Sequence, residues 1–153
     1  MFYTGIGSRE TPEDILFKMK KMAYNAAMNG HILRSGGANG ADLAFETGCD
    51  MHDGLKEIYL PWKGFNGSSS TLYYIPEKAF EIASEIHPAW DKCSPSVRKL
   101  HARNILQVLG QDLNTPSEVV ICWTKDGQYI GGTRTALMVA KLYSIEIINL
   151  YGK

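Results

Sequence analysis

The chain has 153 residues, and its 16 lysine plus arginine side chains equal its 16 aspartate plus glutamate side chains, so the formal net charge is zero. This length predicts one domain over residues 1–153, with a core of ordinary size. A neutral chain lacks the positive field behind most non-specific nucleic-acid affinity, so we expect such binding to be weak at most. No apolar run approaches the roughly 18 residues of a membrane helix, and the polar start does not resemble a signal peptide.

The number and positions of the cysteines indicate the cellular compartment. Cys49, Cys93 and Cys122 are odd in number and scattered, which favours a reducing cytoplasm over a disulfide framework. Cys49 and His52 could offer two metal ligands, but no further ligand stands at metal-site spacing. We therefore expect a cytoplasmic protein without a bound metal and without membrane contact.

The first part of the chain predicts a strand and then a helix. Residues 1–6 form the strand, which breaks at Gly5 and Gly7. The run Thr11-Pro12-Glu13-Asp14 predicts a helix start with the Thr11 hydroxyl as N-cap, and Asn29-Gly30 predicts the helix end. Its apolar stripe recurs at helical spacing at Ile15, Leu16, Met19, Met22, Ala23 and Ala26.

The rest of the chain continues this alternation. Residues 31–35 predict the second strand, and the helix after it carries Leu43, Ala44 and Phe45 and closes between Gly48 and Gly54. Further strands are expected at 57–62, 117–123 and 145–151, and further helices at 76–87, 96–109 and 133–143. Strands that alternate with helices predict an α/β fold. We expect a three-layer Rossmann-like domain with a mainly parallel sheet of about five or more strands.

Glycine-rich segments follow three of the predicted strands. They are "TGIGSRE" at residues 4–10, "SGGANGAD" at 35–42 and "WTKDGQYIGGTRTA" at 123–136. Ligands of such sheets bind beyond the carboxyl ends of the strands, where glycine backbone and helix N-termini present N–H groups to anions. Three such turns at equivalent strand ends predict one crevice that holds a phosphate.

These segments also match a known pattern. The matching residues are Gly5-x-Gly7-Ser8-Arg9, Ser35-Gly36-Gly37-Ala38-x-Gly40-Ala41-Asp42, Arg103-Asn104, and Gly131-Gly132-Thr133 with Thr135-Ala136. They resemble the SLOG superfamily, and within it the Rossmann core of DNA-processing protein A. The chain is still more similar to small stand-alone proteins, many of them phage-encoded, with "GSRETP", "LPWKGFNG", "RN…QVLG" and "CWT-x-DG…GGT". These motifs stand here at residues 7–12, 60–67, 103–110 and 122–133.

The resemblance covers essentially the whole chain and implies binding of nucleotides or nucleotide-derived ligands. It also implies a homodimer or higher homo-oligomer and no separate cofactor. One departure bears on activity: the Lonely Guy branch hydrolyses nucleoside monophosphates with the glutamate of "PGGxGTxxE". Residues 131–138 of this chain, "GGTRTALM", offer no carboxylate at that place, and Arg134 stands where many relatives have glycine. Hydrolysis by that route is therefore not expected, and no catalytic residue is assigned.

The turns and the resemblance together give the expected ligand-binding residues. They are Gly5, Gly7, Ser8, Arg9, Ser35, Gly36, Gly37, Ala38, Gly40, Asp42, Arg103, Asn104, Trp123, Thr124, Gly131, Gly132, Thr133 and Thr135. Arg9 either clamps a phosphate or forms a solvated salt bridge. Asp42 either accepts from a ribose hydroxyl or caps its helix. Trp123 either stacks on a base or packs in the core.

Other candidates stay open at this stage. Glu46 lies one turn after Asp42 and reads as a surface acid, while Arg98 and Arg103 need not share a target because they lie on different sides of a helix. In the same helix Leu100, Ile105, Val108 and Leu109 are expected in the core, and His101 is as consistent with the helix surface as with a site. The segment 61–76 carries the aromatic residues Trp62, Phe65, Tyr73 and Tyr74 and is either a lid, an oligomer contact or a surface loop.

The sequence therefore predicts a binder of a phosphorylated nucleotide-derived small molecule, of adenine, ADP-ribose or cyclic ADP-ribose type, that leaves its ligand intact. If a phage encodes it, it acts in the host cytoplasm and could sequester a nucleotide immune signal. Two alternatives remain. One is a nucleotide N-glycosidase that uses Asp42, Glu46 or another carboxylate at a strand end. The other is single-stranded DNA binding in the manner of DNA-processing protein A.

Overall fold

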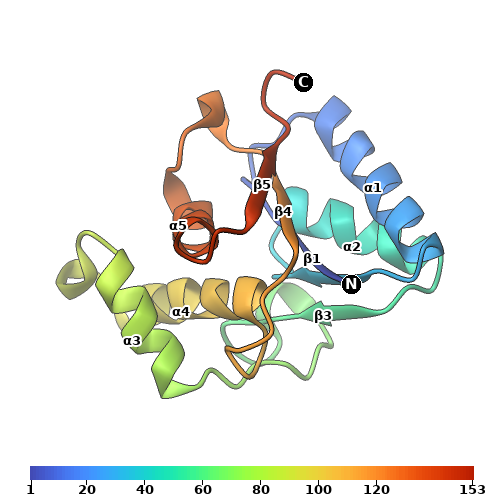
Figure 1. Cartoon of the computed structure of the whole chain (residues 1–153). Coiled ribbons are helices and arrows are strands. Elements are labelled where there is room, and N and C mark those ends of the chain that lie inside the picture. Colours follow the sequence, from blue (N-terminus) through green and yellow to red (C-terminus); the bar gives the residue numbers. More distant parts are fainter.

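Five short parallel strands form the centre of the structure, a computed structural model that describes residues 1–153 (Figure 1). Their order across the sheet is β3-β2-β1-β4-β5, and every neighbouring pair is parallel. The strands are β1 (Phe2–Gly5), β2 (Ile32–Ser35), β3 (Lys56–Ile58), β4 (Val119–Cys122) and β5 (Glu146–Asn149). The order reverses between β1 and β4, and open α/β sheets bind ligands at that place.

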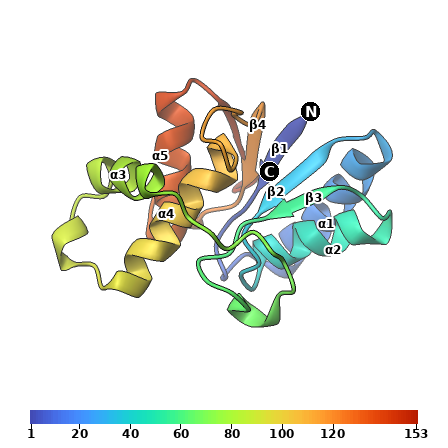
Figure 2. The ribbon, with the colours of Figure 1, turned by 90° about the horizontal axis from the view of Figure 1, so that it is seen from below.

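Helices cover both faces of this sheet, which confirms the three-layer Rossmann-like fold (Figures 1 and 2). One face carries α1 (Glu13–Met28) and α2 (Ala41–Met51), which pack against each other. The other face carries α3 (Glu77–Ile86), α4 (Pro95–Leu109) and α5 (Arg134–Leu142). No helix of the structure has both the length and the apolar character needed to cross a membrane.

Each face has its own apolar cluster. Met19, Leu33 and Phe45 are fully buried between the sheet and the pair α1 and α2. Ile105 and Leu137 belong to the cluster under α3, α4 and α5. The helical spacing of the apolar residues in α1 is confirmed, since Ile15, Met19 and Ala23 are its buried residues.

The predicted cap of α1 was wrong. Helix α1 begins at Glu13, and the Pro12 carbonyl accepts from the N–H groups of Ile15 and Leu16. The Thr11 hydroxyl instead donates to the Ser8 carbonyl oxygen at 2.6 Å. Thr11 therefore closes the turn after β1, because its side chain is buried and points back toward Ser8 rather than along the helix.

The third strand is shorter than the predicted range 57–62. Strand β3 ends at Ile58, after which Tyr59 pairs with Leu72 in an isolated bridge and the Leu60 N–H donates to the Leu72 carbonyl. The chain leaves the sheet here because its partner changes from β2 to the returning segment. The excursion that begins at residue 61 is thereby held to the end of β3 through Leu72.

Helices α1 and α2 approach each other closely at Gly48. A Cβ at Gly48 would collide with the backbone carbonyl of Lys20 in α1. Glycine in the middle of a helix has low helix propensity, so its place here is explained by packing. This contact sets the orientation of α2, whose N-terminus forms part of the crevice described below.

We therefore expect Gly48→Ala to lower the free energy of unfolding by about 1–3 kcal/mol, as overpacking does in a close-packed core. Urea denaturation measures this change. The matched control is Thr47→Ala on the exposed side of the same helix, which should stay within about 0.5 kcal/mol of the parent. Equal stability of the two variants would contradict the close contact of α1 and α2.

Candidate functional site

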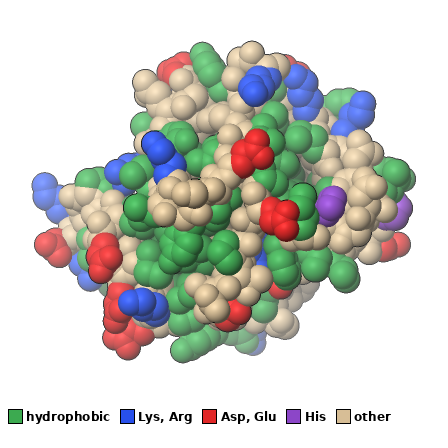
Figure 3. All heavy atoms as spheres, viewed as in Figure 1, with side chains coloured by type: hydrophobic (Ala, Val, Ile, Leu, Met, Phe, Trp, Pro, Cys, Tyr) green, Lys and Arg blue, Asp and Glu red, His purple; other side chains and the backbone are tan.

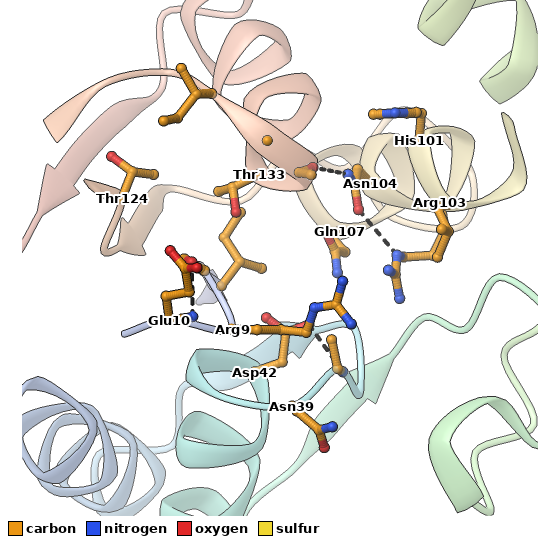
Figure 4. Close-up of a pocket in the computed structure, with 18 of the residues that line it drawn as sticks. Arg9, Glu10, Asn39, Asp42, His101, Arg103, Asn104, Gln107, Thr124 and Thr133 are labelled. Atoms are coloured by element: carbon orange, nitrogen blue, oxygen red, sulfur yellow. Dashed lines mark hydrogen bonds between the residues drawn. The ribbon is translucent and has the colours of Figure 1, made fainter. Parts of the chain in front are cut away.

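The carboxyl ends of β1, β2 and β4 surround a cavity of about 610 Å³ (Figure 4). Its wall includes residues from all three glycine turns and from α4. The predicted site residues that line it are Gly7, Ser8, Arg9, Ala38, Asp42, Arg103, Asn104, Thr124, Gly131, Gly132 and Thr133. The turns that the sequence places far apart therefore meet at one site.

The turn after β1 is held against β4. The Ser8 N–H donates to the Trp123 carbonyl at 3.2 Å, and the Ser8 hydroxyl accepts from the Glu10 N–H at 3.0 Å. Arg9 follows in this turn, takes part in none of the four ion pairs and extends across the cavity (Figure 4). The salt-bridge alternative for Arg9 is therefore absent from the structure, and its guanidinium is free to meet a ligand.

The turn after β2 packs against three polar side chains at Gly36. A Cβ at Gly36 would lie 2.7 Å from Arg103 Nη1 and 2.8 Å from Asp42 Oδ2, and would also overlap the side-chain amide of Gln107. Only glycine leaves room for these groups to converge. The Ser35 hydroxyl donates to the Gly5 carbonyl at 2.6 Å, which fixes the end of β2 beside the end of β1.

Asp42 lies at the bottom of the cavity in the first turn of α2. Its carboxylate accepts from the Ala38 N–H at 3.3 Å and is stabilised by Arg103 and by the N–H of Gly7. Burial nevertheless dominates and raises the pKa of Asp42 from 3.8 to about 6. The carboxyl group of Asp42 thus holds the turn after β2, without capping α2, and offers a titratable group to the cavity.

The predicted pair Arg103 and Asn104 connects two of the turns. Arg103 Nη1 donates to the carbonyl oxygens of Gly36 at 2.6 Å and Tyr59 at 3.1 Å. Arg103 Nε donates to Asn104 Oδ1 at 3.1 Å, and Asn104 Nδ2 donates to the Gly132 carbonyl at 2.6 Å. These two side chains therefore hold the turn after β2 and the turn before α5 at a fixed separation.

The turn before α5 presents open backbone. Nothing lies within 4 Å of a Cβ placed at Gly131 or Gly132. No turn or loop hydrogen bond engages the N–H groups of Gly131, Gly132 or Thr133, and the first N–H groups of a helix have no partner within it. This end of α5 therefore combines the N–H groups of the turn with the positive end of the helix dipole, while the N–H of Arg134, the first residue of α5, donates to the Gly131 carbonyl.

His101 on α4 lines the cavity beside this turn, so the helix-surface alternative does not hold. Its Nδ1 lies 2.8 Å from the Thr135 hydroxyl, and its ring contacts that of His87 with centroids 4.5 Å apart. Burial, followed by His87, Arg103 and Arg134, lowers the pKa of His101 to about 4. The imidazole is therefore neutral at pH 7 and acts there as a hydrogen-bonding group.

The remaining predicted residues do not line the cavity: Gly5, Ser35, Gly36, Gly37, Gly40, Trp123 and Thr135. They form the layer behind its wall. A Cβ at Gly5 would overlap the Phe45 ring, one at Gly37 would meet Leu60 and one at Gly40 would meet the backbone of Arg9. Trp123 packs in the core, and Thr135 is fully buried beneath His101.

Two further charged residues that the sequence left open, Glu46 and Arg98, lie outside the cavity. Glu46 forms an ion pair with Lys56 at 2.8 Å on the outside of α2. Arg98 donates through Nε and Nη2 to the Trp90 carbonyl, at 3.3 and 3.1 Å. Neither side chain lines the cavity.

Sequence reasoning missed part of the wall. The additional lining residues are Ile6, Glu10, Asn39, Phe65, Asn66, Leu100, His101, Gln107, Lys125 and Ile130. Of these, Phe65 and His101 were open candidates in the sequence, and Leu100, which was expected in the core, is only half-buried and lines the cavity instead. Helical spacing could have revealed Gln107, since it lies four residues after Arg103 and thus on the same face. Asn66 gave no such signal, because it reaches the site only through hydrogen bonds to the Gly37 carbonyl and to Asn39, both at 3.0 Å.

Two chemical features follow from this wall. Its only carboxylates belong to Glu10 and Asp42, and its cationic groups include Arg9 and Lys125. No group of three or more His, Cys, Asp or Glu side chains is placed to hold a metal ion. The cavity wall thus contains backbone N–H groups, cations and a hydrogen-bond acceptor, Asp42.

Comparisons of the chain with protein-family models, with curated proteins and with solved structures found no match. The fold class therefore follows from the strand order and helix layers described above. The interpretation of the cavity depends on its own geometry.

The raised pKa of Asp42 predicts how the stability of the protein depends on pH. Its pKa in the folded chain, about 6, is above the ordinary 3.8, so between these values the folded state binds more protons than the unfolded state. The stability of the parent should therefore fall as pH rises from about 4 to 6, by up to about 3 kcal/mol relative to Asp42→Asn, which lacks this titration. Urea denaturation at several pH values gives the difference, and parallel pH profiles would contradict it.

Proposed function

We propose that this protein binds a phosphorylated, nucleotide-derived small molecule of adenine, ADP-ribose or cyclic ADP-ribose type without converting it. The observation that carries the proposal is the meeting of three glycine turns and two helix N-termini at one polar cavity. Its volume of about 610 Å³ falls in the range that holds cofactor-sized ligands.

The phosphate position is supported by the turn before α5. Open backbone at Gly131 and Gly132 lets an anion approach closely, and the N–H groups of Gly131, Gly132 and Thr133 take part in no turn or loop hydrogen bond. Positive charge is supplied by Arg9 in the turn after β1 and by Lys125 in the turn after β4. An anion here receives backbone donors and a guanidinium, which suits a phosphate or pyrophosphate group.

The sugar and base positions are supported by the opposite wall. The Asp42 carboxylate accepts hydrogen bonds, as a ribose hydroxyl requires. Phe65 offers an aromatic ring, and its neighbour Trp62 packs edge-on against it with ring centroids 5.5 Å apart. Asn39, Asn66 and Gln107 add amide groups that both donate and accept, and such groups can read the edge of a base.

Membership of the SLOG superfamily remains part of this proposal, carried by the glycine turns and the Arg103-Asn104 pair. The structure gives that pair a physical task, because it links the turns that a nucleotide would span. If a phage encodes the protein, intact binding of this kind would remove a nucleotide signal from the host cytoplasm. We expect binding without turnover because the turn before α5 carries no carboxylate.

The test uses substitutions at the open turn. Gly132 is the informative position because its φ is unstrained and a side chain there meets only empty space, whereas Gly131 has φ +67° and Gly37 faces Leu60. Isothermal titration with AMP and ADP-ribose should show progressive loss from Gly132→Ala to Gly132→Val, with about tenfold or more for valine. Arg9→Ala should cost about 1.5–3 kcal/mol, roughly ten- to a hundredfold in affinity.

The control is Lys20→Ala on the exposed outside of α1, which should bind like the parent. Thermal melting of every variant separates lost binding from lost folding. If the parent binds neither AMP nor ADP-ribose, or if folded Gly132→Val binds both as tightly as the parent, the proposal is wrong.

A second function is favoured by one observation. Asp42 is a buried carboxyl group in the cavity whose pKa of about 6 suits proton transfer near neutral pH. A nucleotide N-glycosidase would need such a group, and the wall supplies only Glu10 as its partner carboxylate. Glu46 is not available to this reaction, because it is paired with Lys56 outside the cavity.

Chromatography after long incubation separates these functions. We expect AMP, NAD and ADP-ribose to be recovered intact from mixtures with the parent protein. Release of free base that disappears in Asp42→Asn would establish the glycosidase in place of the binder. Base release that persists in this variant but is absent from a mock preparation without the protein would assign the reaction to another carboxylate, such as Glu10, and would also contradict binding without turnover.

Self-association is also proposed, on the exposed side of β5. Strand β5 is an edge of the sheet with no fully buried residue, and Leu142 and Tyr143 beside it are exposed. Figure 3 shows hydrophobic side chains gathered in the middle of this face, with most charged groups toward its rim. Light scattering that finds only the 17.0 kDa monomer at micromolar concentration would contradict a dimer.

A further inference from the structure

A second hollow lies next to the cavity, where the chain passes from α3 to α4. It has a volume of about 770 Å³ and is more open to solvent than the cavity. Its walls include Ser84 at the end of α3, Trp90 and Lys92 in the connecting segment, and Arg98 on α4. None of the functions proposed above uses these residues.

Two histidines separate the hollow from the cavity. His101 lines the cavity, His87 lines the hollow, and their rings touch edge to face with centroids 4.5 Å apart. The two spaces therefore approach each other at this pair of imidazole rings. A ligand too long for the cavity would leave it over His101 and arrive beside His87.

Arg134 links the start of α5 to the end of α3. It is the first residue of α5, directly after the open turn, and its Nη1 donates to the Ile86 carbonyl at 3.3 Å, one residue before His87. The unusual arginine of the third glycine turn thus holds the start of α5 beside His87 in the wall of the hollow, although Arg134 itself lines neither space.

The hollow has the chemistry of a nucleotide subsite. Arg98 is fixed by two bonds to the Trp90 carbonyl, its guanidinium lies 5.2 Å from the centre of the Trp90 ring, and its Nη1 makes no hydrogen bond. Lys92 is exposed and adds a second cation, against the single acid Asp91. Planar groups suit stacking on a base, and the excess of positive charge suits a phosphate.

We propose that the hollow is a second nucleotide subsite, so that the preferred ligand is a small molecule with two nucleotide units joined through phosphate. This inference rests on the proposed function, since the first unit occupies the cavity. The second unit passes over His101 and His87 and places its phosphate or base against Lys92, Arg98 and Trp90.

The experiment compares ligands of one and two units. Isothermal titration measures AMP against NAD and the dinucleotide pApA, for the parent and for Lys92→Glu and Ser84→Trp. We expect a two-unit ligand to bind about tenfold or more tighter than AMP. Lys92→Glu should weaken that ligand about fivefold, and Ser84→Trp should abolish the two-unit advantage by filling the hollow, while both variants bind AMP like the parent.

The matched control is Lys20→Glu, an equal charge reversal on the exposed side of α1. It should leave every affinity unchanged, which excludes an effect of net charge alone. Thermal melting checks that Ser84→Trp is folded, and the exposed Lys92→Glu gives an independent result if it is not.

The outcomes separate the two proposals. If AMP binds but neither two-unit ligand gains affinity, or if the gain survives in both hollow variants, the second subsite is refuted and the nucleotide function stands. If none of the three probes binds, the second subsite is refuted, and the nucleotide function is refuted as well if ADP-ribose also fails to bind. A single-stranded oligonucleotide that outcompetes NAD and pApA at physiological salt would replace the small molecule by DNA.

Discussion

The hydrogen bonds of Arg103 are the constraint on which the site depends. Its guanidinium is buried beside Asp42 and donates to the backbone where β2 and β3 end. Removing these hydrogen-bond partners would leave a buried charged group unsatisfied, so the arrangement is costly to break. Through Asn104 the same helix also holds the turn before α5. One short stretch of α4 thus determines the distance between the walls of the cavity.

Glycine makes this arrangement sterically feasible. At Gly36 three polar side chains occupy the space of a Cβ, and at Gly7 a Cβ would lie 2.8 Å from that of Ala41. The turns can therefore press against α4 and α2 while their outer surface stays open. Glycines that look alike in sequence divide into two groups: some allow turns and helices to pack, and Gly131 and Gly132 leave room for a ligand.

Burial is the main cause of the altered pKa values of two side chains in the cavity wall, His101 and Asp42. His101 is neutral because burial lowers its pKa to about 4, so it adds no repulsion between the turns. The raised pKa of Asp42, about 6, reduces the cost of bringing a phosphate near this carboxyl group in mildly acidic solution. Arg9 and Lys125 are exposed cationic residues of the cavity wall that take part in no ion pair.

The sequence by itself determined the fold class and the neighbourhood of the site. Alternating strand and helix patterns require parallel strands, and glycine turns at strand ends must then meet at one edge of the sheet, as Gly7, Ala38 and Gly132 do. Only the tertiary structure decided which side chains face the cavity. Trp123 and Thr135 are buried behind its wall, while His101 and Gln107 on α4 line it. The physical reason is that a side chain's direction depends on the elements packed against it, and Asn66 reaches the turn after β2 only because the excursion from β3 folds over it.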